Sequence, residues 1–146
     1  MTIIAYKNGI MAADSAVWTG YIYGGEITKI IKTPNGSLVG ASGNHAICSK
    51  FRAWALLENE ETPWEGGDSF YGVIVKKDGT IMMYYDKNGI GEICYEDSHA
   101  IGCGYEIALG AMDAGATAIR AVEIAIKRHA YCSGKIVILK LEGNTQ

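Results

Sequence analysis

A tight turn near the N-terminus constrains this chain more than any other feature. Asn8-Gly9 separates two short runs rich in β-branched and apolar residues, Thr2–Lys7 and Ile10–Asp14. Asn-Gly is the strongest short hairpin signal, because both residues tolerate the positive φ angles of a type I′ turn. A three-residue turn places Thr2 opposite Asp14, and a two-residue turn shifts this pairing by one residue. In either register the sequence predicts that Asp14 lies within about 5–8 Å of Thr2.

The rest of the chain divides into separate runs of strands and helices. The expected strands cover Glu26–Lys32, Ser37–Ser42, Tyr71–Lys76, Thr80–Tyr85, Ile90–Tyr95, Ala100–Gly102 and Lys135–Leu141. The expected helices cover Asn44–Leu57, Tyr105–Ala114 and Thr117–Arg128, with Asn44 and Thr117 as N-caps. Turns are expected at Pro34–Gly36, Lys77–Gly79 and Asp86–Gly89, and a polar tail at Glu142–Gln146.

The order of these elements predicts the fold class. Strands, one helix, strands, two helices and a last strand favour an α+β fold over alternating βαβ units. The inward face of the first helix is expected to contain Ile47, Phe51, Trp54 and Leu57 or Glu58, and that of the third Ile119, Val122, Ala125 and Ile126. Two sheets packed face to face, with helices on both outer surfaces, would bury these faces. With 146 residues, the chain predicts one domain, 1–146.

Composition excludes several classes of function. Hydrophobic residues make up 49% and charged residues 20%, as in ordinary globular proteins. The net charge is -3 with no run of Lys or Arg, so neither nucleic acid nor an anionic membrane is an expected partner. The chain shows no signal-peptide pattern and no apolar stretch near the ~20 residues that a membrane span needs, so we expect a cytoplasmic protein.

The four cysteines give little indication of metal or disulfides. Cys48, Cys94, Cys103 and Cys132 are far apart in the sequence, with no Cys-x-x-Cys. Reduced thiols are therefore expected rather than a disulfide framework. Zinc is only weakly indicated because no pair has ligand spacing, so we expect no metal and no cofactor.

Thr2 can carry hydrolytic chemistry once Met1 is removed. Methionine aminopeptidase normally removes Met1 when a small residue such as threonine follows it. A hydroxyl is a poor nucleophile without a base. A free α-amine has an ordinary pKa of roughly 7.7–8.0, so near neutral pH it can take the hydroxyl proton of its own residue. The simpler interpretation of this residue alone is an ordinary strand position.

Three further residues fit such chemistry. Asp14 ends an apolar strand, where a carboxylate costs free energy unless it has a partner or faces water. Lys29 is a lone cation between apolar residues, either that partner or a solvent-facing strand position. Gly40 lies in the run Leu38–Gly43, where a glycine lets a substrate backbone approach and its N–H can face an oxyanion. The alternative for Gly40 is tight packing of the helix on the sheet.

Six short segments follow one another along the chain in a recognisable order. They are Met1–Tyr6, Met11–Ser15, Glu26–Ile30, Leu38–Gly43, Ala100–Gly104 and Tyr131–Gly134. Their succession resembles that of proteasome β subunits, and more closely that of the bacterial HslV peptidase and its short bacterial and phage relatives. The resemblance covers nearly the whole chain. It implies a four-layer αββα sandwich of the N-terminal-nucleophile hydrolase type.

The resemblance also implies a threonine-type endopeptidase and the roles of its residues. Thr2 would be the nucleophile, with its freed amine as the base. Asp14 and Lys29 would orient Thr2 and lower its effective pKa, and the Gly40 N–H would be the oxyanion donor. The specificity pocket, suited to apolar side chains of a peptide, would lie near Val17, Ile27, Leu38 and Ser42.

Two segments depart from the pattern of that family. Gly102-Cys103-Gly104 stands where Gly-Ser-Gly is usual, and a thiol is a weaker hydrogen-bond partner for the α-amine than a hydroxyl. The usual Asp-x-x-Ser-Gly-Gly reads His129 to Gly134, with His129 in place of the acid and Cys132 in place of the serine. His129 either accepts a hydrogen bond when neutral or closes a helix C-terminus. These changes affect the expected catalytic rate more than the fold.

The resemblance implies partners as well. Subunits of the family stack into closed rings, so it implies a homo-oligomeric ring or double ring, an AAA+ unfoldase ATPase, and a peptide or unfolded-protein substrate. One alternative is a catalytically impaired shell or assembly protein, which Cys103 and His129 favour. Another is an N-terminal-nucleophile amidase acting on a small amide. Trp18, Tyr21 and Tyr23, in the expected loop after Asp14, serve either ring contacts or ordinary packing.

Overall fold

The computed structural model describes residues 1–59, 61–85 and 89–143. The strands are β1 (Ile4–Lys7), β2 (Ile10–Ala13), β3 (Ala16–Thr19), β4 (Ile22–Glu26), β5 (Ile30–Lys32), β6 (Leu38–Gly43), β7 (Phe70–Val75), β8 (Ile81–Tyr84), β9 (Glu92–Cys94), β10 (Ser98–Ile101) and β11 (Val137–Lys140). The helices are α1 (His45–Leu57), α2 (Tyr105–Asp113) and α3 (Ala118–Arg128). This order confirms a mixed α+β fold. Most of the expected turn at 86–89 and the end of the polar tail, residues 144–146, lie outside the described residues.

The first hairpin forms with a two-residue turn. Asn8 and Gly9 have φ angles of 50° and 80°, as a type I′ turn requires. Lys7 lies opposite Ile10 and Ile4 opposite Ala13. This register places Ile3 opposite Asp14, and the N–H of Asp14 donates to the Ile3 carbonyl at 3.2 Å. Thr2 is therefore one residue beyond the pairing, at the open end of the hairpin.

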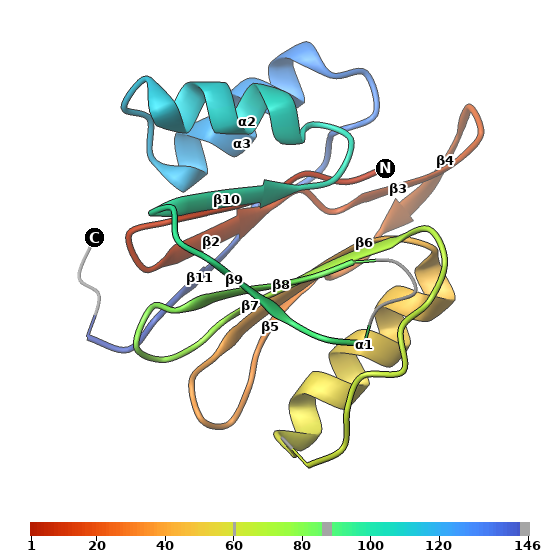
Figure 1. The fold of residues 1–146 in the computed structure, drawn as a ribbon. Helices are drawn as coiled ribbons and strands as arrows, with labels where there is room; N and C mark the ends of the chain where they lie inside the picture. The colour runs from red at the N-terminus through yellow and green to blue at the C-terminus, as the bar shows by residue number, and fades with distance from the viewer. Residues whose placement is uncertain (60, 86–88, 144–146) are drawn as a thin grey trace.

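The strands form two larger sheets and one separate hairpin (Figure 1). The four-stranded sheet has the order β10-β1-β2-β11, the five-stranded sheet the order β5-β6-β7-β8-β9, and β3 pairs with β4. Both β1 and β2 are buried on both faces. Ile3 and Ala5 pack toward α2 and α3, whereas Ile4 and Tyr6 pack toward the five-stranded sheet. This alternation follows from the two-residue period of a strand.

The helices cover the outer faces of the two sheets (Figure 1). Small buried residues on α2 and α3, including Ala108, Ala121 and Ala125, let these helices approach β1 and β2 closely. On the other side, α1 packs on β6 and β7 through Phe51, whose ring contacts Phe70 at a centroid distance of 4.9 Å. Strand β1, which follows Thr2, is thus held in the middle of the molecule.

The helix caps agree with the sequence, but the buried face of α1 does not. Asn44 and Thr117 cap α1 and α3 as expected, each side chain accepting from the N–H three residues later. The fully buried residues of α1 are Cys48, Phe51 and Ala55. Ile47 and Trp54 lie at the edges of this stripe and Leu57 is 73% exposed, so the expected face is rotated by about one residue. On α3, Val122 and Ala125 are buried, and Ile119 and Ile126 are half-buried.

The segment after Asp14 is a hairpin, not the loop that the sequence suggested. β3 and β4 pair antiparallel, with Gly20 in the turn at a φ angle of 60°. The expected strand Glu26–Lys32 is broken, because β4 ends at Glu26 and β5 begins at Ile30. The irregular link at 27–29 carries Lys29 inward to the first hairpin. In the part of the chain that the structure describes, the helices lack the length and the apolar character that a membrane span needs.

Candidate active site at Thr2

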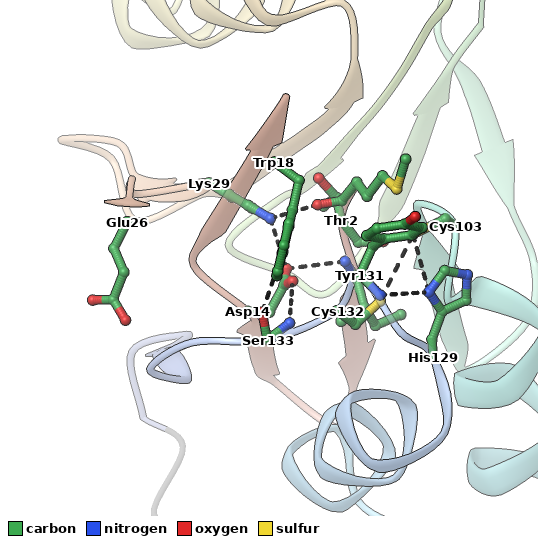
Figure 2. A network of polar contacts seen from close by, with 12 residues as sticks. Thr2, Asp14, Trp18, Glu26, Lys29, Cys103, His129, Tyr131, Cys132 and Ser133 are labelled. Atoms are coloured by element: carbon green, nitrogen blue, oxygen red, sulfur yellow. Dashed lines mark hydrogen bonds and ion pairs between the residues drawn. The ribbon is translucent and has the colours of Figure 1, made fainter. Parts of the chain in front are cut away.

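The Asp14 carboxylate lies at the centre of a buried polar network beside Thr2 (Figure 2). Its Oδ1 accepts from the Lys29 ammonium at 3.0 Å and from the Ile3 N–H at 3.0 Å. Its Oδ2 accepts from the Ser133 N–H at 3.1 Å. Asp14 is completely buried and Lys29 is 4% exposed. The structure therefore brings Asp14 and Lys29 together, and the carboxylate has the partners that a buried charge requires.

Local chain geometry explains why these groups meet. The loop after α3 runs along the end of β2, where the Ser133 carbonyl accepts from the N–H groups of Ser15 and Ala16 at 3.2 and 3.0 Å. Gly134 follows with a φ angle of 89°, and a Cβ there would lie 2.7 Å from the Ser15 hydroxyl. A glycine is thus needed for the loop to reach Asp14. Ser133 and Gly134 belong to the segment Tyr131–Gly134 that the sequence resemblance includes, and here they support the site through their backbone.

Lys29 also contacts the residue that precedes Thr2. Its ammonium donates to the Met1 carbonyl at 2.8 Å, in addition to the bond with Asp14. Thr2 is only 8% exposed, whereas Met1 is 52% exposed. Two pockets meet at these two residues, with volumes of about 630 and 130 Å³. Removal of Met1 would open both pockets directly onto Thr2 and free one donor of the ammonium.

The expected substrate residues divide between these pockets and the core. Val17 and Ile27 line the smaller pocket, and Ser42 lines the larger one. Leu38 lines neither of them. It is completely buried between the two sheets, so the expectation that it contacts substrate is wrong. Ala41, which the sequence did not single out, occupies the wall of the smaller pocket instead.

Gly40 is also misplaced for the oxyanion role. It lines neither pocket at Thr2, and a Cβ there would lie 3.1 Å from the Ile4 side chain, inside the core. Gly40 lies opposite Val73 in the β6–β7 ladder. Further along the same ladder, the Asn44 N–H donates to the Ser69 carbonyl at 2.7 Å, so Asn44 and Ser69 form a hydrogen-bonded pair. Antiparallel pairs alternate along the strand, so Gly40 falls in a hydrogen-bonded pair and its N–H is used by the sheet.

Gly43 is the glycine that lies beside Thr2. It lines both pockets, has a φ angle of 112°, and has no room for a Cβ, which would overlap the Ser69 carbonyl. By the same alternation, the pair Gly43–Phe70 is not hydrogen-bonded, so the Gly43 N–H points away from β7. The signal that could have identified it is a glycine directly before an N-cap, at the end of a buried strand.

The smaller pocket is not wholly apolar. Besides Val17, Ile27 and Ala41, its lining includes His45 and Arg52 from α1. The Arg52 guanidinium donates to the Ser49 hydroxyl at 3.4 Å. This contact leaves other N–H groups of the guanidinium available to a ligand. This pocket therefore offers a positive charge to whatever enters it, which the sequence interpretation did not anticipate.

Cys103, His129 and Cys132 meet on another side of Thr2. The two sulfur atoms are 3.7 Å apart, and Cys103 Sγ lies 3.9 Å from His129 Nδ1. Cys103 Sγ is also 3.4 Å from the Thr2 carbonyl oxygen. A hydrogen bond from the Cys132 thiol lowers the pKa of Cys103 to about 6. The same interaction, together with burial, raises the pKa of Cys132.

His129 takes both positions that the sequence left open. It is the C-cap residue of α3, with its N–H donating to the Ala125 carbonyl at 2.7 Å. Its Nδ1 accepts from the Tyr131 N–H at 3.2 Å. Because the Nδ1 lone pair is the acceptor in that bond, the neutral ring carries its proton on Nε2.

The aromatic residues after Asp14 pack beside the site. Trp18 lies edge-on to Tyr131 at 5.7 Å, and its Nε1 donates to the Ser133 hydroxyl at 3.4 Å. This contact ties the β3–β4 hairpin to the loop that holds Asp14. Tyr21 and Ile22 at the hairpin tip remain 86% and 71% exposed. Trp18 is thus a packing residue, and the tip leaves an apolar surface uncovered.

A half-buried histidine lies on the wall of the larger pocket. His99 is on β10 opposite Tyr6, and burial lowers its pKa below the ordinary value. A neutral imidazole is the state that this environment favours.

The comparisons with known proteins establish the fold. No protein-family model matches the sequence, and no curated protein does. BPH of Thiobacillus denitrificans superposes with a TM-score of 0.63 at 18% identity, covering 98% of this chain and 99% of that one. BPH in complex with epoxomicin gives 0.63 at 17% identity, covering 96% and 98%. HslV from Trypanosoma brucei gives 0.68 at 16% identity, covering 95% and 98%. The similarity that the sequence indicated is confirmed for the fold, which is that of these proteasome-like proteins.

Proposed function

We propose that this chain, with its proteasome-like fold, is a threonine-type endopeptidase subunit whose nucleophile is Thr2 after removal of Met1. The observation that carries the proposal is the buried ion pair of Lys29 and Asp14, with its 3.0 Å contact, beside Thr2 at the start of the first hairpin. A buried charge pair is costly to build and is a weak way to gain stability. Its location where two pockets meet at Thr2 favours a chemical role.

The proposed chemistry begins with the free α-amine of Thr2. The amine takes the proton from the hydroxyl of the same residue as Oγ attacks the substrate carbonyl, and it then protonates the leaving amine. Lys29 loses its Met1 acceptor when Met1 is removed, so its ammonium can turn toward the Thr2 oxygen. A positive charge beside the Thr2 oxygen stabilises the negative charge that develops on it. Asp14 holds Lys29 and, through the Ile3 N–H, the start of β1.

The oxyanion donor in this proposal is the Gly43 N–H, in place of Gly40. Gly43 lines both pockets at Thr2, and its N–H points away from β7 by the alternation of the ladder. A backbone N–H directed at the position where negative charge develops stabilises the tetrahedral intermediate. The missing Cβ lets the substrate carbonyl approach that N–H closely.

The two pockets suggest how a peptide is bound. The smaller pocket, about 130 Å³, takes one side chain, and the Arg52 guanidinium favours an acidic one there. This refines the expectation of an apolar preference. The larger pocket, about 630 Å³, takes further residues of the peptide. Since BPH has been solved in complex with epoxomicin, we propose epoxomicin as a ligand of the Thr2 site here too.

The proposal extends to assembly and location. Residues 1–146 would form one domain, a four-layer αββα sandwich of the N-terminal-nucleophile hydrolase type, and copies would form a homo-oligomeric ring or double ring in the cytoplasm. The exposed Tyr21 and Ile22 at the β3–β4 tip support a contact between copies. An AAA+ unfoldase would supply unfolded-protein substrates to such a ring.

A catalytically impaired shell protein is the second candidate. Cys103, His129 and Cys132 meet on one side of Thr2 where the family pattern has hydroxyls and a carboxylate, and this observation favours reduced or absent activity. The experiment that separates the two is hydrolysis of fluorogenic peptides by wild type and Thr2→Ala, with N-terminal sequencing and particle mass measured on both. The endopeptidase proposal predicts that Thr2→Ala abolishes hydrolysis and leaves the particle mass unchanged. Residual hydrolysis by Thr2→Ala would refute Thr2 as the nucleophile.

A further inference from the structure

Three metal-binding side chains converge next to Thr2 from distant parts of the sequence. Cys103 follows β10, His129 caps α3, and Cys132 lies in the loop before β11. Their ligand atoms all lie within 4.8 Å of one another (Figure 2). We propose that Cys103, His129 and Cys132 form a binding site for a borderline-soft divalent cation, with Zn²⁺ as the preferred ion. The wide spacing of the cysteines in the sequence conceals this site.

Two of the three separations between ligand atoms are close to the edges of a tetrahedral site. With Zn–S bonds of about 2.3 Å and Zn–N bonds of about 2.0 Å, tetrahedral geometry requires about 3.8 Å between two sulfurs and about 3.5 Å between sulfur and nitrogen. The observed Sγ–Sγ separation is 3.7 Å and the Cys103 Sγ–Nδ1 separation is 3.9 Å. The third separation, between Cys132 Sγ and the His129 ring nitrogen, falls within the 4.8 Å that bounds all three ligand atoms, so rotation of these side chains would bring the two atoms together around one ion.

The chemistry of the donors selects the kind of ion. Two thiolates and one imidazole suit zinc and other thiophilic ions, whereas Mg²⁺ and Ca²⁺ require oxygen ligands. The ion would take the Nδ1 lone pair that now accepts from the Tyr131 N–H. Cys103 is exposed and Cys132 buried, so an ion can enter from the Cys103 side and be held against the interior.

Three protein ligands leave a fourth position open, as in zinc sites that bind water or another ligand. Cys103 Sγ lies 3.4 Å from the Thr2 carbonyl oxygen, so this position is next to the residue that carries the proposed nucleophile. The free Thr2 amine would therefore coordinate a bound ion, could no longer act as the base, and hydrolysis would be inhibited. That consequence depends on the proposed function, whereas metal binding itself does not.

Cobalt titration of the reduced full-length protein tests the site. Co²⁺ in a tetrahedral two-thiolate site gives intense ligand-field bands and a thiolate-to-cobalt charge-transfer band, which Zn²⁺ removes by displacement. We expect these bands to saturate at one equivalent in wild type and in Thr2→Ala. Cys103→Ser should reduce the intensity of the charge-transfer band to that of one thiolate or less, and His129→Asn should weaken binding at least tenfold. Cys94→Ser, which changes a half-buried cysteine on β9, is the matched control and should bind as wild type does.

The proposal is overturned if reduced wild type gives no thiolate-to-cobalt band, or if the band keeps its full intensity in Cys103→Ser. It is also overturned if protein from its own host contains a Cys103–Cys132 disulfide and no zinc, because the two cysteines would then be a redox pair and not metal ligands. Far-ultraviolet circular dichroism of each variant confirms that the fold is retained. Cobalt binding by a protein without peptidase activity would support the metal site and contradict only the proposed function.

Discussion

The Lys29 ammonium lies 3.0 Å from Oδ1 of Asp14, and the two side chains are 4% and 0% exposed. Backbone groups of Ile3, Ser133 and Met1 complete the hydrogen bonds of this pair. Two charges buried this deeply are stable only together, because each would otherwise lie in a medium of low polarity without a counter-charge. Through these bonds the Asp14 carboxylate holds three segments: the start of the first hairpin, the link at 27–29 and the loop after α3.

Asp14→Asn should destabilise the fold strongly. It leaves the buried Lys29 ammonium without its counter-charge, and breaking a buried pair in this way costs about 3–5 kcal/mol. Urea unfolding followed by circular dichroism measures the change. Arg120→Gln is the control, because it breaks an exposed 3.5 Å pair with Glu123, which contributes about 1 kcal/mol or less. Equal effects of the two substitutions would contradict the role of the buried pair.

Gly43→Ala should destabilise the protein and close the site. The φ angle of 112° is unfavourable for alanine, and the added Cβ would overlap the Ser69 carbonyl. The expected loss is at least about 2 kcal/mol, from backbone strain and overpacking together. Gly20→Ala is the matched control, since Gly20 also has a positive φ angle, 60°, but open space around the Cβ. A Gly43→Ala protein as stable as Gly20→Ala would show that the strand end is placed differently.

His99 should make the fold sensitive to mild acid. Burial lowers the pKa of His99 in the folded state, so below the ordinary pKa of about 6.5 the unfolded chain binds more protons than the folded one. This contribution to stability is fully present above about pH 6.5 and is lost as the pH falls, by at most about 1.4 kcal/mol per pH unit. Urea unfolding at a series of pH values from 7.5 to 5, in wild type and His99→Phe, measures it.

The His99→Phe variant should lose part of this pH dependence, because it has no group to protonate at that position. His45→Gln, which changes an exposed histidine, is the control and should retain the wild-type profile. An unchanged profile in His99→Phe would show that other groups cause the acid sensitivity.

Arg52 should give the smaller pocket its preference for acidic side chains of the peptide. In Arg52→Leu, kcat/KM for peptides with an acidic residue before the cleaved bond should fall roughly ten- to hundredfold, the cost of losing a hydrogen bond to a charged group. Peptides with a small apolar residue there should be affected much less. Arg128→Leu, at the exposed end of α3, is the control. A uniform loss across all peptides in Arg52→Leu would place Arg52 outside the specificity pocket.

Local signals in the sequence were sufficient for much of the fold. The turn at Asn8-Gly9, the caps Asn44 and Thr117, and the alternation of apolar residues depend on near neighbours, so they can be read directly. The β3–β4 hairpin could not, because Gly24-Gly25 has low strand propensity and the tip is exposed. Its pairing is favoured by tertiary contacts such as Trp18 with Tyr131.

The candidate site was predictable only in part, for a related reason. The proximity of Asp14 to Thr2 follows from one hairpin. The choice between Gly40 and Gly43 as oxyanion donor depends on which residues of β6 form hydrogen-bonded pairs with β7. That pattern is a property of the paired strands and cannot be read from a single segment. The meeting of Cys103 with Cys132 likewise depends on contacts between residues 29 positions apart.

The most direct test of the account is a covalent label on protein purified from its own host. Intact mass gives the N-terminus, and peptide mapping after treatment with a peptide vinyl sulfone locates the modified residue. We predict a chain that begins at Thr2 and carries one label on Thr2, with the same result in Cys103→Ser. An intact Met1, or a label found on Cys103 and lost in Cys103→Ser, would contradict the account.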